Sequence, residues 1–391
     1  MGIRLTLPLV MDGTGSCSEL TGEDPDNVCC EESIIRKPEL LTAEKKNAMD
    51  MGFNALLSPT GDITHARLED LGYDDSFEDY LETVTELTVA AADNRLPVGG
   101  VIRRSDPVAS EYGRNVFESA YFAHLEHINI LKDAGASFIL LRSFDKLWDM
   151  RAGVLAAKSA DIPVLVTMQV DDEGQSSGDT DYLAALITLQ SLGADGFGIE
   201  CTDGAELTPE LIGKAYSHAE IPLIAVVDMQ AAGGELIAEL CDNGASVFLN
   251  TSKGCRAENL DIIRNTRVSF RPGEEKDSYA ATIYKEAFFL PEYIELSEPL
   301  MCDLDMSDEL IDFDDETVNA IYIQLHSTDD AAFLADNADM TSLPFVVHTD
   351  DPTVLEAALR YYQGRLIVDG QCDIDSDRLQ RLVKKYGALI Y

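Results

Sequence analysis

A short apolar run followed by an amphipathic stretch repeats eight times between residue 5 and about residue 265. Such runs are typical of buried parallel strands, and the stretches between them have the spacing of surface helices. The predicted strands are Leu5–Asp12, Ala55–Thr60, Pro97–Ile102, Phe138–Phe144, Pro163–Val170, Gly196–Cys201, Pro222–Asp228 and Val247–Thr251. The predicted helices begin near Pro38, Phe77, Val116, Lys146, Thr180, Thr208, Gly233 and Arg256.

Four of the predicted helices end in a glycine just before the next strand, at Gly52, Gly135, Gly193 and Gly244. Glycine at that position adopts the left-handed conformation that ends a helix. Eight β/α units in one series favour a closed (β/α)8 TIM barrel over an open doubly wound sheet. No glycine-rich phosphate motif follows the first strand, which agrees with that choice. The fold class is therefore predicted as α/β, with a barrel over residues 1–265.

The pattern stops after the barrel and returns in a shorter form near the C-terminal end. Residues 266–315 contain Arg271-Pro-Gly and an acidic run, which indicate a surface linker. Residues 316–391 are predicted to form the strands Ala320–Leu325, Phe345–His348, Arg365–Asp369 and Ala388–Tyr391, with helices near 328–338, 351–362 and 376–386. Four strands cannot close a barrel, so we expect a partial α/β, half-barrel-like domain. Its open sheet needs a partner surface and would allow a homo-oligomer through the C-terminal domain.

The charge of the chain excludes some classes of partner. A formal net charge of −42 argues against binding nucleic acid along a basic groove and against binding anionic membrane surfaces. The eight cysteines are spread thinly over 391 residues, unlike a secreted disulfide framework. No apolar stretch of the chain is long enough to span a membrane, and from its first residues we expect no signal peptide. We therefore expect a cytoplasmic protein with reduced thiols.

Several segments of the predicted barrel resemble a known family. They are Leu9-Val-Met-Asp-Gly13, Ala134-Gly-Ala-Ser-Phe-Ile-Leu-Leu141, Asp161-Ile-Pro-Val-Leu-Val-Thr-Met168 and Gly193-Ala-Asp-Gly-Phe-Gly-Ile-Glu-Cys201. The chain resembles the homocysteine S-methyltransferases, and in particular the homocysteine-binding barrel of the cobalamin-dependent methionine synthases. Its tail, through Leu343-Pro-Phe-Val-Val-His348 and Lys384-Lys-Tyr-Gly-Ala-Leu-Ile390, resembles the first part of their pterin-binding barrel.

The resemblance implies a zinc site that activates the homocysteine thiol, held by one cysteine after strand six and a cysteine pair after strand eight. Cys201 matches the first ligand, but the pair is replaced by Ser252-Lys253-Gly254, with Cys255 just beyond. A helix start after Cys255 is expected to lower the pKa of its thiol. Cys29 and Cys30 follow the first strand and are candidate replacements for the pair. The alternatives are a small buried hydrophobe for Cys201 and unrelated loop thiols for the rest.

The implied substrate site also departs from the family. Asp12 and Gly13 keep the Asp-Gly signature of the first strand, and Gly61 is what remains of the pattern after strand two. Arg142 replaces the carboxylate that would meet the substrate amine, so it favours a ligand with a carboxylate or phosphate. The alternative for Arg142 is an ion pair with Asp145 or Asp171. In the tail, His348 and Asp369 stand where the family contacts the pterin.

Five positive or titratable side chains on the barrel are weaker candidates. Arg103 and Arg104 form a second positive cluster after strand three, and His65 follows strand two as a candidate base. His124 and His127 lie three residues apart on the third predicted helix, where a surface or packing role is expected. No catalytic residue is assigned.

The function predicted from these residues and the resemblance is methyl transfer to a thiol, of the methionine synthase type. The thiol of a small-molecule substrate would be activated by zinc, and the methyl group would come from a corrinoid on a separate partner protein. The alternative is a non-catalytic or repurposed homologue that binds an anionic ligand or a partner protein at the barrel mouth. In both cases the barrel mouth is the expected binding site.

Overall fold

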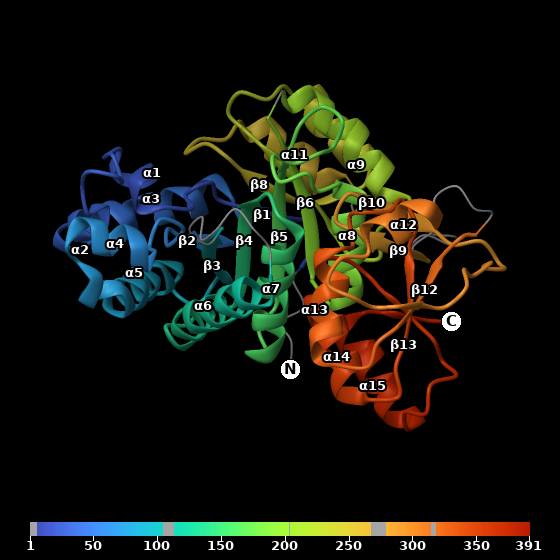
Figure 1. Cartoon of the computed structure of the whole chain (residues 1–391). Coiled ribbons are helices and arrows are strands. Elements are labelled where there is room, and N and C mark those ends of the chain that lie inside the picture. Colours follow the sequence, from blue (N-terminus) through green and yellow to red (C-terminus); the bar gives the residue numbers. More distant parts are fainter. Residues whose placement is uncertain (1–5, 105–112, 203, 267–278, 314–317) are drawn as a thin grey trace.

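Eight parallel strands form a closed barrel at the centre of the N-terminal part of the molecule (Figure 1). The structure is a computed structural model that describes residues 6–104, 113–202, 204–266, 279–313 and 318–391. The barrel strands are β1 (Leu9–Met11), β2 (Leu56–Ser58), β3 (Val98–Arg103), β4 (Phe138–Phe144), β5 (Val164–Val170), β6 (Gly196–Cys201), β7 (Leu223–Val227) and β8 (Ala245–Asn250).

The barrel closes between its first two strands. Strands β2 to β8 pair in sequence and β8 pairs with β1. The gap between β1 and β2 is bridged by the parallel contact of Met11 with Ala55 and by a hydrogen bond from Asn54 N to Val10 O of 3.0 Å. The predicted TIM barrel is therefore confirmed.

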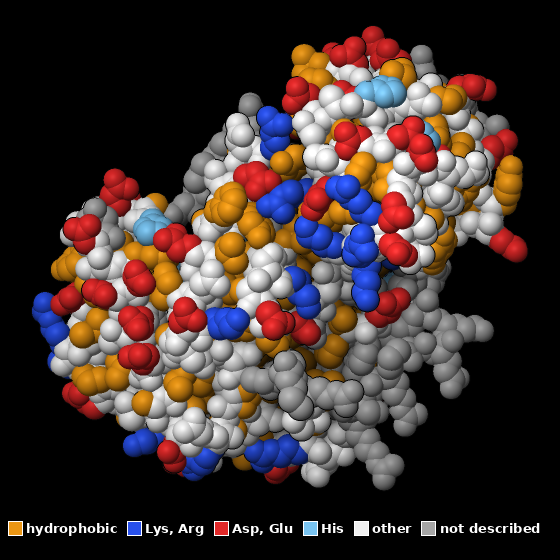
Figure 2. Space-filling view, turned by 90° about the horizontal axis from the view of Figure 1, so that it is seen from below, with side chains coloured by type: hydrophobic (Ala, Val, Ile, Leu, Met, Phe, Trp, Pro, Cys, Tyr) orange, Lys and Arg blue, Asp and Glu red, His pale blue; other side chains and the backbone are white. Residues whose placement is uncertain are grey.

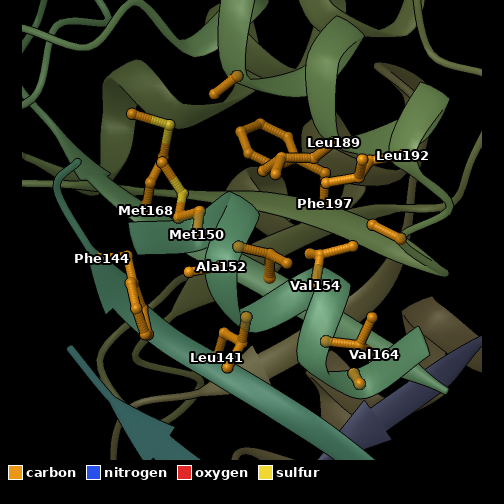
Figure 3. Packing of buried hydrophobic residues seen from close by; sticks show 14 of the residues in the cluster. Leu141, Phe144, Met150, Ala152, Val154, Val164, Met168, Leu189, Leu192 and Phe197 are labelled. Atoms are coloured by element: carbon orange, nitrogen blue, oxygen red, sulfur yellow. The ribbon is translucent and has the colours of Figure 1, made fainter. Parts of the chain in front are cut away.

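The strands are apolar along most of their length because both of their faces are buried. One set of side chains fills the barrel interior, including Leu57, Phe138 and Leu249. The other set packs under the surrounding helices, and Figure 3 shows this layer where Phe144, Met168 and Phe197 meet side chains from the helices outside. At about 25 cal/mol per Å² of apolar surface, this two-sided burial is the main stabilising term of the barrel.

The helices around the barrel begin within two residues of the predicted positions. They are α3 (Pro38–Met51), α5 (Phe77–Ala92), α6 (Arg114–Asp133), α7 (Leu147–Ser159), α8 (Tyr182–Leu192), α9 (Thr208–Tyr216), α10 (Gly234–Asp242) and α11 (Ala257–Asn265). The four predicted glycine stops all have positive φ angles, between 101° and 104°. A side chain there would be strained, which explains why glycine ends these helices.

Short helices that the sequence pattern did not predict enlarge the loops above the barrel. They are α1 (Cys17–Thr21), α2 (Cys30–Arg36), α4 (His65–Leu71), η1 (Asp74–Ser76) and η2 (Ala205–Leu207). Helices α1 and α2 follow β1, and α4 follows β2. Each is too short to produce a clear helical period, so only tertiary packing reveals it.

The C-terminal part contains a five-stranded parallel sheet, one strand more than predicted. Its strands are β11 (Leu300–Met301), β12 (Ile321–Gln324), β13 (Phe345–His348), β14 (Ile367–Val368) and β15 (Leu389–Ile390), paired in sequence order. Its helices are α12 (Ser307–Phe313), α13 (Thr328–Asp336), α14 (Pro352–Tyr361) and α15 (Ser376–Tyr386). The partial α/β domain is thus present.

One expectation about the linker is wrong for the residues that the structure describes. An antiparallel hairpin of β9 (Ala280–Ile283) and β10 (Glu286–Phe289) lies in the segment expected on the surface, and β9 is buried throughout. Ala281 and Ile294 pack with Val346 and Ile367 of the C-terminal sheet. This segment therefore covers the sheet face that was expected to need a partner surface. Residues 267–278, which include Arg271-Pro-Gly, lie outside the described residues.

Polar contacts, most of them partly buried, hold the C-terminal domain against the barrel. Arg360 at the end of α14 donates to both carboxylate oxygens of Glu118 on α6, at 2.5 and 2.8 Å. Arg151 of α7 donates to the carbonyls of Leu359 and Arg360, at 2.8 and 3.2 Å. These carbonyls end α14 and have no partner within the helix, so a cation from the barrel stabilises this helix end.

The face seen from below in Figure 1 carries a gathering of Lys and Arg side chains among acidic and hydrophobic ones (Figure 2). Helix α15 carries four exposed cationic side chains, Arg378, Arg381, Lys384 and Lys385. The charge of this acidic chain is therefore unevenly distributed. Within the described residues, no helix combines the length and the apolar character that crossing a membrane requires.

Candidate functional site

A β-bulge in strand β4 lies at the carboxyl end of the barrel. The register against β5 shifts between Leu141 and Phe144, and Ser143 has a φ angle of +61°. Left-handed backbone at a residue other than glycine costs about 1–3 kcal/mol and often marks a functional site. Two hydrogen bonds hold it: Ser143 N donates to Thr167 Oγ1 at 3.1 Å, and Ser143 Oγ donates to Glu200 Oε2 at 2.8 Å.

Arg142 lies in this bulge and is 5% exposed. Its Nη1 donates to Gly13 O at 3.3 Å and lies 3.6 Å from Glu19 Oε2. Its buried Nε–H has no hydrogen-bond partner. A side chain at Gly15 would collide with the same guanidinium. Arg142 therefore lies against the loop after β1, with one donor free to bind an acceptor.

Glu19 contacts both Arg142 and Arg103 at the barrel mouth. It accepts from Arg103 Nη2 at 2.5 Å, and Arg103 Nη1 lies 3.4 Å from Asp62 Oδ1. Arg104 pairs instead with Asp145, at 2.8 Å. The expected partners of Arg142 were Asp145 or Asp171, but the carboxylate that meets it is Glu19 of α1. A short helix in a loop brings that carboxylate in, so the pairing leaves no pattern in the sequence.

Asp12 is buried at the end of β1 and is already paired. Its Oδ2 accepts from Lys45 Nζ of α3 at 2.5 Å, and its Oδ1 accepts from Leu57 N at 2.5 Å. Burial raises the pKa of Asp12 to about 6, although Lys45 opposes the shift, so the carboxylate is ionised at neutral pH. In this structure Asp12 ties the first two strands and α3 together below the mouth. Sequence reasoning missed Lys45, which no motif marks.

Gly13 and Gly61 lie at points where two loops approach each other closely. A Cβ on Gly13 would lie 2.6 Å from Ser252 O and 2.8 Å from Asn250 O. A Cβ on Gly61 would lie 2.7 Å from Gly15 O. The two glycines thus allow the loops after β1, β2 and β8 to pack together. This close packing places the loop carrying Gly13 and Gly15 against Arg142.

The four candidate zinc ligands do not form a metal-binding group. Among the described residues, no set of three or more His, Cys, Asp or Glu side chains is arranged to hold a metal ion. Cys29 and Cys30 lie at the start of α2, at one end of the molecule, whereas Cys201 ends β6 near its centre (Figure 1). The residues present therefore do not fit the zinc site that the resemblance implies.

Each of these thiols has local contacts of its own. Cys201 Sγ lies 3.6 Å from Asp171 O, and Cys255 Sγ lies 3.3 Å from Arg256 O. The expectation of an acidic Cys255 is wrong, because burial raises the pKa of its thiol to about 11. Burial likewise raises the pKa values of the Cys29 and Cys30 thiols, which belong to the hydrophobic core.

The barrel histidines do not lie at the mouth as a group. His65 is exposed at the start of α4 and lies 3.3 Å from Glu126. His124 is buried and lies 2.7 Å from Asp149 Oδ1 on α7. His127 is also buried, and its Nε2 has no hydrogen-bond partner. His124 therefore has the expected packing role. Nε2 of His127 is left without a hydrogen-bond partner.

In the tail, His348 and Asp369 contact each other at the carboxyl ends of β13 and β14. His348 Nδ1 lies 2.9 Å from Asp369 Oδ2, and the Tyr322 hydroxyl donates to the same oxygen at 2.7 Å. These bonds help lower the pKa of Asp369, against the effect of burial. The structure thus brings into direct contact the two residues that the sequence analysis singled out in the tail.

A parallel barrel with polar loops and a strained residue at its carboxyl end is the architecture of a TIM-barrel enzyme. The comparison with known families specifies the class further. The model of the family described as "Homocysteine S-methyltransferase" matches residues 9–263, which is most of the barrel. The chain therefore belongs to the homocysteine S-methyltransferase family, a family of methyltransferases.

Known relatives agree with this placement. The chain is 22% identical over 331 residues to methionine synthase of Mycobacterium leprae, a match covering 68% of the chain and 27% of that protein. Methionine synthase of Mycobacterium tuberculosis is 24% identical over 201 residues, covering 48% of the chain and 17% of that protein. The chain thus spans about a quarter or less of these curated relatives.

A solved structure shows the same fold. The metallated form of the homocysteine methyltransferase MmuM from Escherichia coli matches with a TM-score of 0.54 and 18% identity. The match covers 67% of this chain and 96% of that one. At this identity the likeness concerns the fold, and it covers a share of the chain comparable to that of the barrel.

Proposed function

We propose that this chain binds a small thiol of the homocysteine type at the barrel mouth and transfers a methyl group to its sulfur. The observation that carries the proposal is the buried guanidinium of Arg142 in the β4 bulge, with its Nε–H free. A homocysteine-like substrate has a carboxylate, and arginine binds carboxylates through charge-assisted hydrogen bonds. Arg142 therefore orients the substrate by its carboxylate, where the family uses a carboxylate to bind the amine.

The transfer step is an attack of the substrate sulfur on a methyl carbon. The thiol first loses its proton to water, because the thiolate is the nucleophile. The sulfur–carbon bond then forms while the bond between the methyl group and its donor breaks, and the bonding electron pair leaves with the donor. The proposed donor is a corrinoid carried by a separate partner protein, in keeping with the methionine synthase relatives.

The resemblance predicts zinc with Cys201 as one ligand, and Cys255, Cys29 and Cys30 were the candidate replacements for the missing pair. Because the described residues do not assemble these ligands, we derive no step through a metal. Metal analysis of protein purified without chelator tests the prediction. Zinc at close to one equivalent, lost in Cys201→Ser, would support it, and a metal-free protein that still binds homocysteine would refute it.

A second candidate is a non-catalytic relative that binds an anionic ligand at the same mouth. The absence of a described metal-binding group and the charge reversal at Arg142 favour it. The two candidate functions share Arg142 as the ligand-binding residue, but only the first includes methyl transfer. Binding without methyl transfer is therefore the result that would identify the second candidate.

Calorimetry with L-homocysteine, with and without zinc, is the first test. We expect saturable binding to the wild-type protein and a loss of at least about tenfold in affinity in Arg142→Met. Arg378→Met, on exposed α15, is the control and should bind like wild type. Transfer from methylcobalamin to bound homocysteine then separates enzyme from binding protein. An absence of binding under both conditions would exclude homocysteine chemistry.

A further inference from the structure

A pocket of about 160 Å³ lies beside the barrel, between the end of β3 and helices α4, α5 and α6. Its apolar lining comes from Phe77, Ile102 and Ala123. His65, His124 and His127 add three imidazole rings, of which His65 stacks on Phe77 with ring centroids 3.7 Å apart. An apolar cavity of roughly 150 Å³ is large enough to bind benzene. The pocket thus has the size and lining for a single aromatic ring.

Two buried polar atoms of the lining residues have no hydrogen-bond partner. They are Nε2 of His127 and Nε of Arg103. His127 is 8% exposed, and its ring packs edge-on against Phe77 with centroids 5.4 Å apart. A buried polar atom left unpaired costs about 1–3 kcal/mol. A ligand that supplied the missing partners would recover that free energy.

The electrostatics of the pocket favour a neutral ligand over an anion. Arg103 is paired with Glu19 and Asp62, and Arg104 is paired with Asp145. Burial lowers the pKa of His127 to about 3, with smaller effects from His124 and His65. The imidazole of His127 is therefore uncharged at neutral pH. The arginine charges at the rim are matched by carboxylates, so no net positive charge is left to attract an anion.

We propose that this pocket is a binding site for a small neutral aromatic hydroxyl compound, of the phenol class. The ring occupies the apolar space beside Phe77 and Ile102. The hydroxyl oxygen can accept from Arg103 Nε–H, and the hydroxyl hydrogen can be donated to His127 Nε2. The site shares Arg103 with the barrel mouth but does not include Arg142, and it does not rest on the proposed methyl transfer. It adds a second ligand to the barrel, bound on its flank.

Titration calorimetry of the full chain with phenol, benzene and benzoate tests the proposal. We expect saturable phenol binding that is at least about fivefold tighter than benzene binding, the equivalent of one net hydrogen bond. Ala123→Trp, which fills the pocket from an exposed helix position, should weaken phenol binding by at least about tenfold. Phe122→Trp, at the exposed neighbouring position, is the matched control and should bind phenol like wild type.

His127→Phe should remove the preference for phenol over benzene. Should that variant fail to fold, nitrogen-15 spectra of the wild-type imidazoles give a second readout, because the His127 Nε2 resonance must shift when phenol binds. No saturable phenol binding, binding unchanged in Ala123→Trp, an unshifted His127 resonance, or benzoate bound more tightly than phenol would each overturn the proposal. Arg142→Met should leave phenol binding unchanged, which separates this site from the homocysteine site proposed at Arg142.

Discussion

Lys45 Nζ donates to Asp12 Oδ2 across 2.5 Å, and both side chains are closed to solvent. This ion pair links helix α3 to the end of β1, and Glu44 adds a second carboxylate 3.1 Å from the same ammonium. The Asp-Gly signature at the first strand was predicted to bind substrate. In the folded chain the Asp12 carboxylate is instead occupied by a side chain 33 residues away.

Removing Lys45 should destabilise the barrel strongly. Lys45→Met leaves the Asp12 carboxylate buried without its cation, which typically costs about 3–5 kcal/mol. Urea unfolding measures the loss. Lys46→Met, at the exposed next position of α3, is the control and should change stability by less than about 0.5 kcal/mol. Equal effects of the two substitutions would contradict a structural role for the pair.

Gly15→Ala should disturb the candidate binding site more than the fold. The new methyl group would meet the guanidinium of Arg142, whose flexible side chain can move away. We therefore expect homocysteine affinity to fall by about tenfold. The unfolding free energy should change by no more than about 1 kcal/mol. Gly233→Ala is the control, because a Cβ there meets nothing within 4 Å and the φ angle is not positive. Unchanged affinity in Gly15→Ala would argue against Arg142 as the ligand-binding residue.

His127 should make the protein less stable in acid. Its pKa is lowered to about 3 by burial, whereas in the unfolded chain it is about 6.5. Between these values the unfolded state takes up a proton that the folded state does not. Stability therefore falls as the pH drops from about 6.5, by up to about 1.4 kcal/mol per pH unit.

Urea unfolding at pH 7.0 and pH 5.0 compares wild type with His127→Phe. The variant should lose less stability than wild type between these two pH values. His326→Phe, at an exposed position, should follow the wild-type curve. A His127→Phe curve parallel to that of wild type would show that His127 is protonated equally in both states.

Arg360 and Glu118 should couple the C-terminal domain to the barrel. Their bidentate contact is partly buried, and the guanidinium also lies 4.4 Å from the ring centroid of Tyr121. Glu118→Gln should cost about 1.5–3 kcal/mol, the range for hydrogen bonds to charged groups. The contact mainly lowers the pKa of Glu118, so its contribution is present above pH 4.5 and is lost as the pH falls through the lowered value.

Hydrogen exchange locates that effect. In Glu118→Gln, amide protection should decrease where α6 meets α14, while the distant helix α11 stays protected as in wild type. Glu126→Gln, on the exposed side of α6, is the control. A uniform loss of protection over the whole chain would mean that the contact stabilises the fold without joining the two parts locally.

The regular elements of this protein were predictable, while the partners of its charged groups were not. Strand β4 was predicted with the bounds that it has, and Arg142 lies near its carboxyl end. The bulge at Ser143 was not foreseen, because it depends on Thr167 and Glu200 from the neighbouring strands. Glu19 was missed as the partner of Arg142, since the helix that presents it has only five residues.

The hairpin of β9 and β10 shows the same limit in the C-terminal part. Ala280–Ile283 is too short and too ordinary in composition to be distinguished from a surface linker by its pattern. The strand is buried because the C-terminal sheet has an apolar face and this segment is close enough along the chain to cover it. Only the packing of this segment against the C-terminal sheet identifies it as a buried strand.

The amino-acid sequence by itself determined the series of strands and helices, the closed barrel and the family, because alternating apolar runs and glycine stops act over a few residues. The tertiary structure alone decided what lies at the barrel mouth. It pairs Asp12 with Lys45 and Arg142 with Glu19, and it leaves the four candidate cysteines without a common metal-binding group. The physical reason is that ion pairs and ligand sets join side chains from distant segments, whose separation only the folded chain fixes.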